Sequence, residues 1–259
     1  MSVQACAELV EAGDPLRFRT TMVAPLAARE VLFPIHAFCL EVAKAPWITQ
    51  EAMIAEMRLQ FWRDVLQEKA DGKPPRAHEV AAPLHAVLDG PAAEALDGAV
   101  TARQWDIYRD PHEDQAALHS YLHASYAIPL HVAARILGAP AESAKSLNRV
   151  LLGGALARYL MALPALEAAG RIPLVDGRPD SIRTFAADVY AQARLGAQDL
   201  KLDKIARAPL MDAMMHLPIL RQAARNPDAV LDGRLRQGPV WQALRLARVS
   251  QARSWSRVR

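Results

Sequence analysis

Apolar residues recur along most of the chain at spacings of three and four, which is the pattern of amphipathic helices. In one such segment Ala55, Leu59, Trp62 and Leu66 fall on a single face of the predicted helix. Runs of five or more residues that alternate between apolar and polar positions, as half-buried strands do, are hard to find. The pattern therefore predicts an all-α chain.

Prolines, glycines and capping residues divide this pattern into separate helices. Asp14 and Pro15 are suited to the N-cap and first-turn positions of one helix, and Thr49 and Ser181 to the caps of two others. We predict helices over residues 2–13, 25–44, 78–88, 92–108, 113–138, 141–169, 181–202, 209–225 and 239–255. A further helix starts at residue 14, and another runs from residue 49 to a loop at 71–75. We also predict a break near Gly98, within the helix at 92–108. Without repeats or linkers, residues 1–259 are expected to form one domain that ends in a basic helix at 238–259.

Composition argues against a membrane-spanning protein and a secreted one. A hydrophobic content of 52% is ample for a large core, but we find no uncharged apolar run of about 18 residues and expect no membrane-spanning helix. The N-terminal segment lacks the basic and apolar regions of a secretory signal. Cys6 and Cys39 lie far apart, so we expect two reduced thiols, with Cys39 buried. A cytoplasmic location follows.

The net charge of +3 hides an asymmetry, because the segment from Arg234 to the C-terminus carries seven arginines and no acidic residue. Such a segment attracts anionic surfaces. Its predicted helix mixes arginines with Trp241 and Trp255, which suits an interfacial membrane helix. An ordinary docked helix with an arginine-rich outer face has the same composition. No nucleic-acid partner is expected, since the basic residues are confined to one end.

Aspartates spaced i, i+4 are candidate metal ligands, because they point the same way from a helix and can share Mg²⁺. Five such pairs occur: Asp106/Asp110, Asp110/Asp114, Asp176/Asp180, Asp199/Asp203 and Asp228/Asp232. Prolines interrupt two of them and lysines flank a third, so a metal role is not favoured. His119, His123 and His131 have spacings of four and eight, but without an adjacent glutamate a histidine packing face is the preferred interpretation.

Five ordered segments resemble the squalene/phytoene synthase family: DPLRF (14–18), Ala24-Pro25 with Arg29, AFCLEVAK (37–44), RLQFWRDVL (58–66) and GRIPL (170–174). The resemblance implies the isoprenoid synthase (terpenoid synthase) fold, a helical bundle around a central, largely apolar cavity. It also implies that active members bind Mg²⁺ and prenyl diphosphates through two aspartate-rich motifs and condense the prenyl groups head to head.

Both motifs are degenerate in this chain. The positions that match the family's metal ligands hold Ala43, Lys44 and Trp47 in the first motif, and Ala162 and Leu166 in the second. Arg158 stands where the family has asparagine. None of these side chains can ligate Mg²⁺. In this respect the chain resembles the branch of the superfamily that contains the assembly factors of respiratory complex I more than it resembles active phytoene synthases.

We therefore interpret the chain as a squalene/phytoene synthase-like protein with a non-catalytic role, either binding a lipid or isoprenoid or assembling a respiratory or other membrane complex at the inner membrane. The alternative is an active head-to-head prenyltransferase; only that alternative requires Mg²⁺, and no other cofactor is expected. Candidate ligand-binding residues are Glu41, Lys44, Arg58, Gln60, Arg63, Asp64 and Arg158. For Arg63 and Asp64 a structural ion-pair network is the alternative. The expected membrane or partner surface comprises Trp241, Arg245, Arg248 and Trp255.

Overall fold

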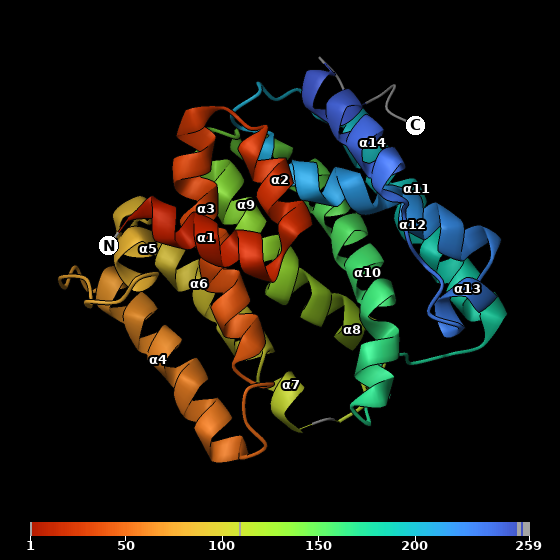
Figure 1. The fold of residues 1–259 in the computed structure, drawn as a ribbon, viewed down its shortest axis with the longest axis horizontal. Coiled ribbons are helices and arrows are strands. Elements are labelled where there is room, and N and C mark those ends of the chain that lie inside the picture. Colours follow the sequence, from red (N-terminus) through yellow and green to blue (C-terminus); the bar gives the residue numbers. More distant parts are fainter. Residues whose placement is uncertain (1, 109, 253–254, 256–259) are drawn as a thin grey trace. The chain divides into compact units, whose positions relative to one another are not determined.

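The chain is all-α in a computed structural model that describes residues 2–108, 110–252 and 255, and no strand occurs among them (Figure 1). The predicted fold class is thereby confirmed. The α-helices are α1 (Val3–Gly13), α2 (Pro15–Met22), α3 (Leu26–Lys44), α4 (Ala52–Ala70), α5 (Ala81–Val87), α6 (Gly90–Ala102), α7 (Trp105–Tyr108), α8 (Gln115–Leu122), α9 (Ile128–Ile136), α10 (Ala144–Ala168), α11 (Pro179–Asp199), α12 (Met211–Arg225), α13 (Asp228–Leu231) and α14 (Pro239–Gln251). Short 3₁₀ turns occupy Ala141–Ser143 and Ala208–Leu210.

Several helix starts differ from those predicted. Asp14 caps α2 as expected, accepting a hydrogen bond from the Arg17 amide at 3.1 Å. Thr49, however, lies before the N-cap residue of α4, and its hydroxyl accepts from the Glu51 amide instead. Ser181 lies inside α11, which begins two residues earlier, and its hydroxyl donates to the Asp176 carboxylate at 2.6 Å. In both cases a side-chain hydrogen bond within the preceding turn takes the place of the predicted cap.

The predicted helix at 113–138 is two helices joined by a π-helical turn at His123–Ala127. Pro129 follows this turn directly, and proline has neither an amide hydrogen to donate nor room for the usual carbonyl four residues earlier. The wider turn accommodates both constraints. The break predicted near Gly98 is wrong, because α6 continues through that residue and ends at Ala102.

Contacts between residues divide the chain into two compact units that interleave in sequence. Unit 1 comprises residues 1–108, 124–139 and 202–209, and unit 2 comprises residues 109–123, 140–201 and 210–259. Each unit is built around its own long helices, and the single domain proposed from the sequence stays a prediction.

In unit 1, α3 contacts α1, α2, α4, α5 and α9. The face predicted for α4 is buried, which confirms the spacing argument, and Trp62 packs edge to face on Phe38 with ring centroids 5.4 Å apart. Cys6, rather than Cys39, is the buried thiol: Cys39 is half-buried, and both are free. Burial raises the pKa of the Cys6 thiol to about 11, with a smaller contribution from Glu79, so this thiol stays protonated.

In unit 2, α10, α11 and α12 pack against one another. Gly153 and Gly196 lie at these contacts, where the neighbouring helix approaches too closely for a larger side chain. The segment Ala141–Ala168, which includes α10, is long and apolar enough to cross a membrane, contrary to the sequence expectation. However, 61% of its most apolar window is buried within the protein, so its apolar side chains serve the core.

Candidate functional site

The last turn of α3 carries the residues that correspond to the family's first motif. Lys44 forms an ion pair with Glu41 one turn earlier, with 3.6 Å between Nζ and Oε1. Ala43 is half-buried and Trp47 is exposed. The one carboxylate in this turn is therefore matched by a neighbouring ammonium, which also lies where the helix dipole favours a cation.

Arg63 and Asp64 on α4 take part in ion pairs within unit 1. Arg63 donates from Nε and Nη2 to the two oxygens of Asp97 on α6, at 2.8 and 3.2 Å, and this hydrogen bonding raises the pKa of Arg63. Asp64 accepts from Gln60 at 2.7 Å and lies 3.6 Å from Arg76. These contacts favour the structural alternative for the pair. Arg58, on the same helix, is exposed.

The residues that match the second motif lie on α10 in unit 2. Arg158 faces Asp212 of α12, with its Nη1 at 3.4 and 3.5 Å from the two carboxylate oxygens. Asp212 is only 2% exposed, and its carboxylate also lies 3.4 Å from Nδ1 of His216. Of the two aspartate positions, Ala162 is exposed and Leu166 is buried. Position 158 thus belongs to a buried polar cluster between two helices.

The residues at both motifs do not fit Mg²⁺, because a hard dication needs several oxygen ligands and these five positions offer none. Over the described residues, no group of three or more His, Cys, Asp or Glu side chains could hold a metal ion. Members of the spaced aspartate pairs have protein partners instead: Asp106 pairs with Arg103, Asp176 with Arg178, Asp199 with Arg149 and Asp232 with Arg234.

His119, from the histidine-rich segment, packs against Phe185 of α11 with ring centroids 5.3 Å apart. Burial lowers the pKa of His119, because the apolar surroundings disfavour its charged form. This geometry is that of a packing histidine.

Acidification is therefore expected to destabilise unit 2 through His119. Below the ordinary histidine pKa of about 6.5, the unfolded chain takes up a proton that the folded chain resists, so the free energy of unfolding falls. The His119→Phe variant keeps an aromatic contact with Phe185 but cannot titrate. Urea unfolding at a series of pH values between neutral and mildly acidic should show the wild type losing stability relative to this variant. A relative gain in acid would contradict the assignment.

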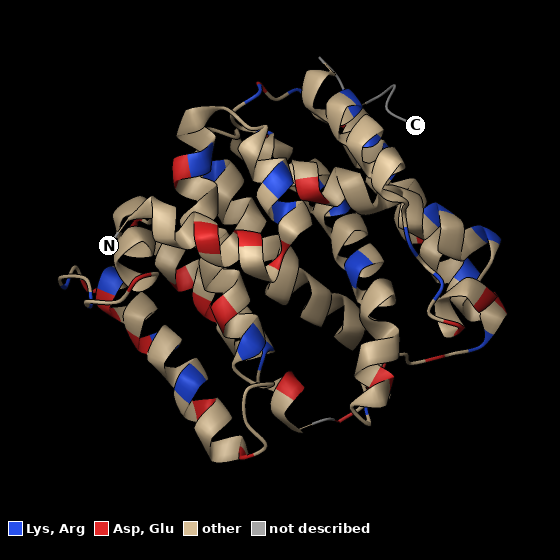
Figure 2. Cartoon of the chain, viewed as in Figure 1, with Lys and Arg blue, Asp and Glu red and all other residues tan. Residues whose placement is uncertain are grey.

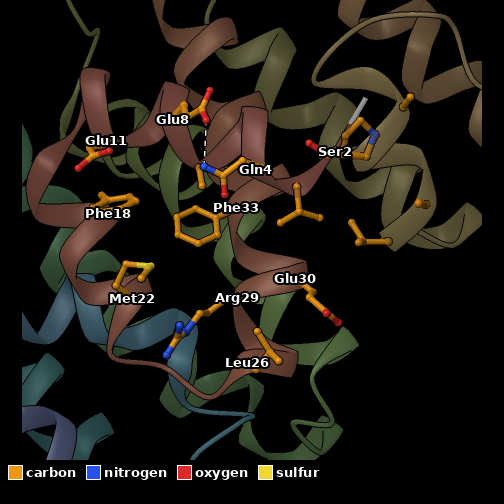
Figure 3. Close-up of a pocket in the computed structure, with 16 residues that line it drawn as sticks. Ser2, Gln4, Glu8, Glu11, Phe18, Met22, Leu26, Arg29, Glu30 and Phe33 are labelled. Atoms are coloured by element: carbon orange, nitrogen blue, oxygen red, sulfur yellow. Dashed lines mark hydrogen bonds between the residues drawn. The ribbon is translucent and has the colours of Figure 1, made fainter.

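Unit 1 contains an open groove of about 820 Å³ that was not predicted from the sequence, and its walls come from α1, α2, α3 and α5 (Figure 3). Phe18 and Phe33 pack together there with centroids 5.7 Å apart, and Met22 lies beside them (Figure 3). Three carboxylates, Glu8, Glu11 and Glu30, border these apolar side chains. Its lining includes none of the seven candidate ligand-binding residues. Because the lining residues of this groove come from four helices, no single sequence motif could have revealed it.

The four residues of the expected C-terminal surface separate into two pairs. Trp241 and Arg248 are exposed on α14. Arg245 donates hydrogen bonds to the Met214 carbonyl of α12, and Trp255 is 4% exposed. The expectation that all four face outward is therefore wrong for Arg245 and Trp255, which hold the C-terminal segment in place.

Comparison with known proteins places this geometry in a family. A family profile described as squalene/phytoene synthase matches residues 10–174, more than half of the chain. A search of curated protein sequences returned no significant match. Among solved structures, a dehydrosqualene synthase in complex with ligand superposes with a TM-score of 0.77 at 14% identity, covering 95% of this chain and 94% of that one. Squalene synthase HpnC from Alicyclobacillus acidocaldarius gives a TM-score of 0.68 at 16% identity, covering 86% and 93%. These likenesses confirm the terpenoid synthase-like helical fold, and the profile shows that the chain belongs to the squalene/phytoene synthase family.

Proposed function

We propose that this protein is a non-catalytic member of its family that acts as a binding and assembly protein at a membrane complex, of the kind represented by respiratory complex I. The observation that carries the proposal is the state of the two motifs. Five metal-ligand positions hold residues without carboxylates. The charged residues that remain there, Lys44 and Arg158, are paired with Glu41 and Asp212.

Head-to-head prenyl transfer requires a diphosphate to leave, and its developing negative charge must be stabilised as the bond breaks. Metal ions do this by bridging phosphate oxygens and carboxylate ligands. A lysine supplies one positive charge but cannot bridge two groups, and Lys44 already neutralises Glu41. The side chains at the motif positions thus supply a scaffold without the means to activate the leaving group.

The fold shared with dehydrosqualene and squalene synthases does not argue against this proposal, because one fold supports many functions and the site decides the chemistry. We propose that the chain retains the ability to bind a lipid or isoprenoid, since apolar recognition needs no metal. The proposed setting is the cytoplasmic side of the inner membrane.

Purified full-length protein is expected to release no pyrophosphate from farnesyl or geranylgeranyl diphosphate in the presence of Mg²⁺. A coupled pyrophosphate assay and extraction of apolar products measure this directly. Lys44→Ala and Arg158→Ala variants serve as controls and should give the same background as the wild type. Turnover that either substitution alters would overturn the proposal and establish the head-to-head prenyltransferase.

The second arm of the same test addresses the binding role. Full-length protein used as bait in native membranes, solubilised with mild detergent, should recover a subunit of a respiratory or other membrane complex at near-stoichiometric yield. Quantitative mass spectrometry identifies that subunit against a bait-free control. If no such subunit is recovered, the assembly role is contradicted even where catalysis is absent.

A further inference from the structure

The outward face of α14 is apolar, which is the reverse of an ordinary surface helix. Val240, Trp241 and Leu244 are 69%, 71% and 58% exposed. Positions 241, 244 and 248 follow one another at spacings of three and four, so Arg248 continues the same face. Folding normally buries such large side chains, and exposing several together marks an interaction surface.

Polar contacts, rather than these apolar side chains, hold the C-terminal segment of unit 2. Arg245 donates from Nε and Nη2 to the Met214 carbonyl, at 3.1 and 2.7 Å. Gln237 donates to the Met215 carbonyl at 2.9 Å. After the helix, the buried indole of Trp255 donates from Nε1 to the Val249 carbonyl at 3.0 Å. The apolar face is therefore presented on a helix whose orientation relative to α12 is fixed.

Positive charges from three helices lie near Arg245 of α14. Burial is the main cause that lowers the pKa of Arg245 to about 10; Tyr190 opposes the shift, and the positive charges of Arg221, Arg194 and Arg248 contribute to it. Those three arginines come from α12, α11 and α14. Because each affects the pKa of Arg245, each lies near it. Helix α14 itself carries arginine but no acidic residue, as the blue bands in Figure 2 show.

We propose that the outward face of α14 is an interfacial anchor that binds an anionic lipid bilayer. Val240, Trp241 and Leu244 enter the boundary between headgroups and acyl chains, and Arg248 contacts headgroup phosphates. Apolar burial and charge attraction together stabilise such helices at a membrane surface, and tryptophan is suited to the boundary because its ring is apolar and its N–H is polar. The anchor depends on exposure and charge and not on the degenerate motifs, so it holds whether or not the protein is catalytic.

Flotation of full-length protein with vesicles tests the anchor. The wild type should bind vesicles of mixed phosphatidylcholine and phosphatidylglycerol and bind pure phosphatidylcholine at least about tenfold more weakly. Replacing both apolar side chains, as Trp241→Ala with Leu244→Ala, should weaken binding to the anionic vesicles at least about tenfold. Arg248→Glu should have a comparable effect there and little effect on neutral vesicles.

Two controls match these variants. Ile172→Ala removes an equally exposed apolar side chain elsewhere in unit 2, and Lys145→Glu makes the same change in net charge at an exposed position on α10. Both should bind as the wild type does. Circular dichroism establishes that each variant is folded, which the exposure of the substituted side chains leads us to expect. In addition, vesicle binding should shift tryptophan fluorescence to the blue, and Trp241→Phe should remove most of that shift while binding persists.

The proposal is overturned if the wild type does not float with anionic vesicles, or if the α14 variants bind as well as their controls. Binding that Arg248→Glu abolishes but the double alanine variant leaves unchanged would also overturn it, because the arginines would then recognise a polyanion without insertion. These readouts are independent of pyrophosphate release and of partner recovery, so this anchor and the proposed function can fail separately.

Discussion

Asp212→Ala is expected to lower the free energy of unfolding by about 3 kcal/mol, the lower end of the range for breaking a buried ion pair. Asp212 is 2% exposed, and its carboxylate faces both Arg158 and Nδ1 of His216. Its removal leaves Arg158, whose side chain is only 29% exposed, without this counter-charge. Urea unfolding followed by circular dichroism gives the difference directly.

A surface pair in the same unit provides the matched control for this prediction. Asp199 lies 3.6 Å from Arg149, but its side chain is exposed, so Asp199→Ala should change stability by less than about 1 kcal/mol. Substituting Arg158 and Asp212 together by leucine should cost less than the two single changes added, because neither charge is then left alone. Equal effects of Asp212→Ala and Asp199→Ala would show that the buried cluster does not hold α10 to α12.

Gly196→Ala is expected to lower the free energy of unfolding by about 1–3 kcal/mol, although alanine favours a helix over glycine by about 1 kcal/mol. A Cβ atom at this position of α11 would lie 2.6 Å from the Ser146 carbonyl oxygen and 2.8 Å from Cβ of Arg149. A backbone oxygen cannot rotate away, so α10 and α11 must move apart. Loss of packing then outweighs the gain in helix propensity.

The control for Gly196 is the same substitution in a helix with room to spare. At Gly98 in α6, the nearest atom to a Cβ would be Cδ1 of Ile128 at 3.9 Å, an ordinary contact distance. Gly98→Ala should therefore stabilise the protein by about 0.5–1 kcal/mol. The two substitutions are expected to have opposite signs in thermal or urea unfolding. If Gly196→Ala were also stabilising, the close approach of α10 to α11 would be refuted.

Features determined by neighbouring residues could be predicted from the sequence. The cap at Asp14 depends on residues within one turn, and the buried face of α4 follows from helical spacing alone. Features that depend on distant residues could not. Arg158 and Asp212 are 54 positions apart, and nothing in either local sequence selects the other as its partner.

The C-terminal helix illustrates the same limit in another way. Its composition indicated a helix with tryptophans and arginines, but composition cannot distinguish the side that docks from the side that faces out. The structure resolves this: Arg245 donates to the Met214 carbonyl of α12 and Val249 is fully buried, whereas Trp241 is 71% exposed. A residue type that is usually exposed, arginine, thus anchors the helix, and a residue type that is usually buried, tryptophan, faces outward.

The interleaving of the two units has a consequence for biosynthesis. Unit 1 takes its last segment from residues 202–209, after most of unit 2 has been translated. Unit 1 therefore cannot be completed until residue 209 has been translated, and no contiguous stretch of the gene encodes the whole of one unit without part of the other. We expect the nascent chain to hold its N-terminal helices in an incomplete state until late in translation, a period in which their apolar faces depend on chaperones for protection.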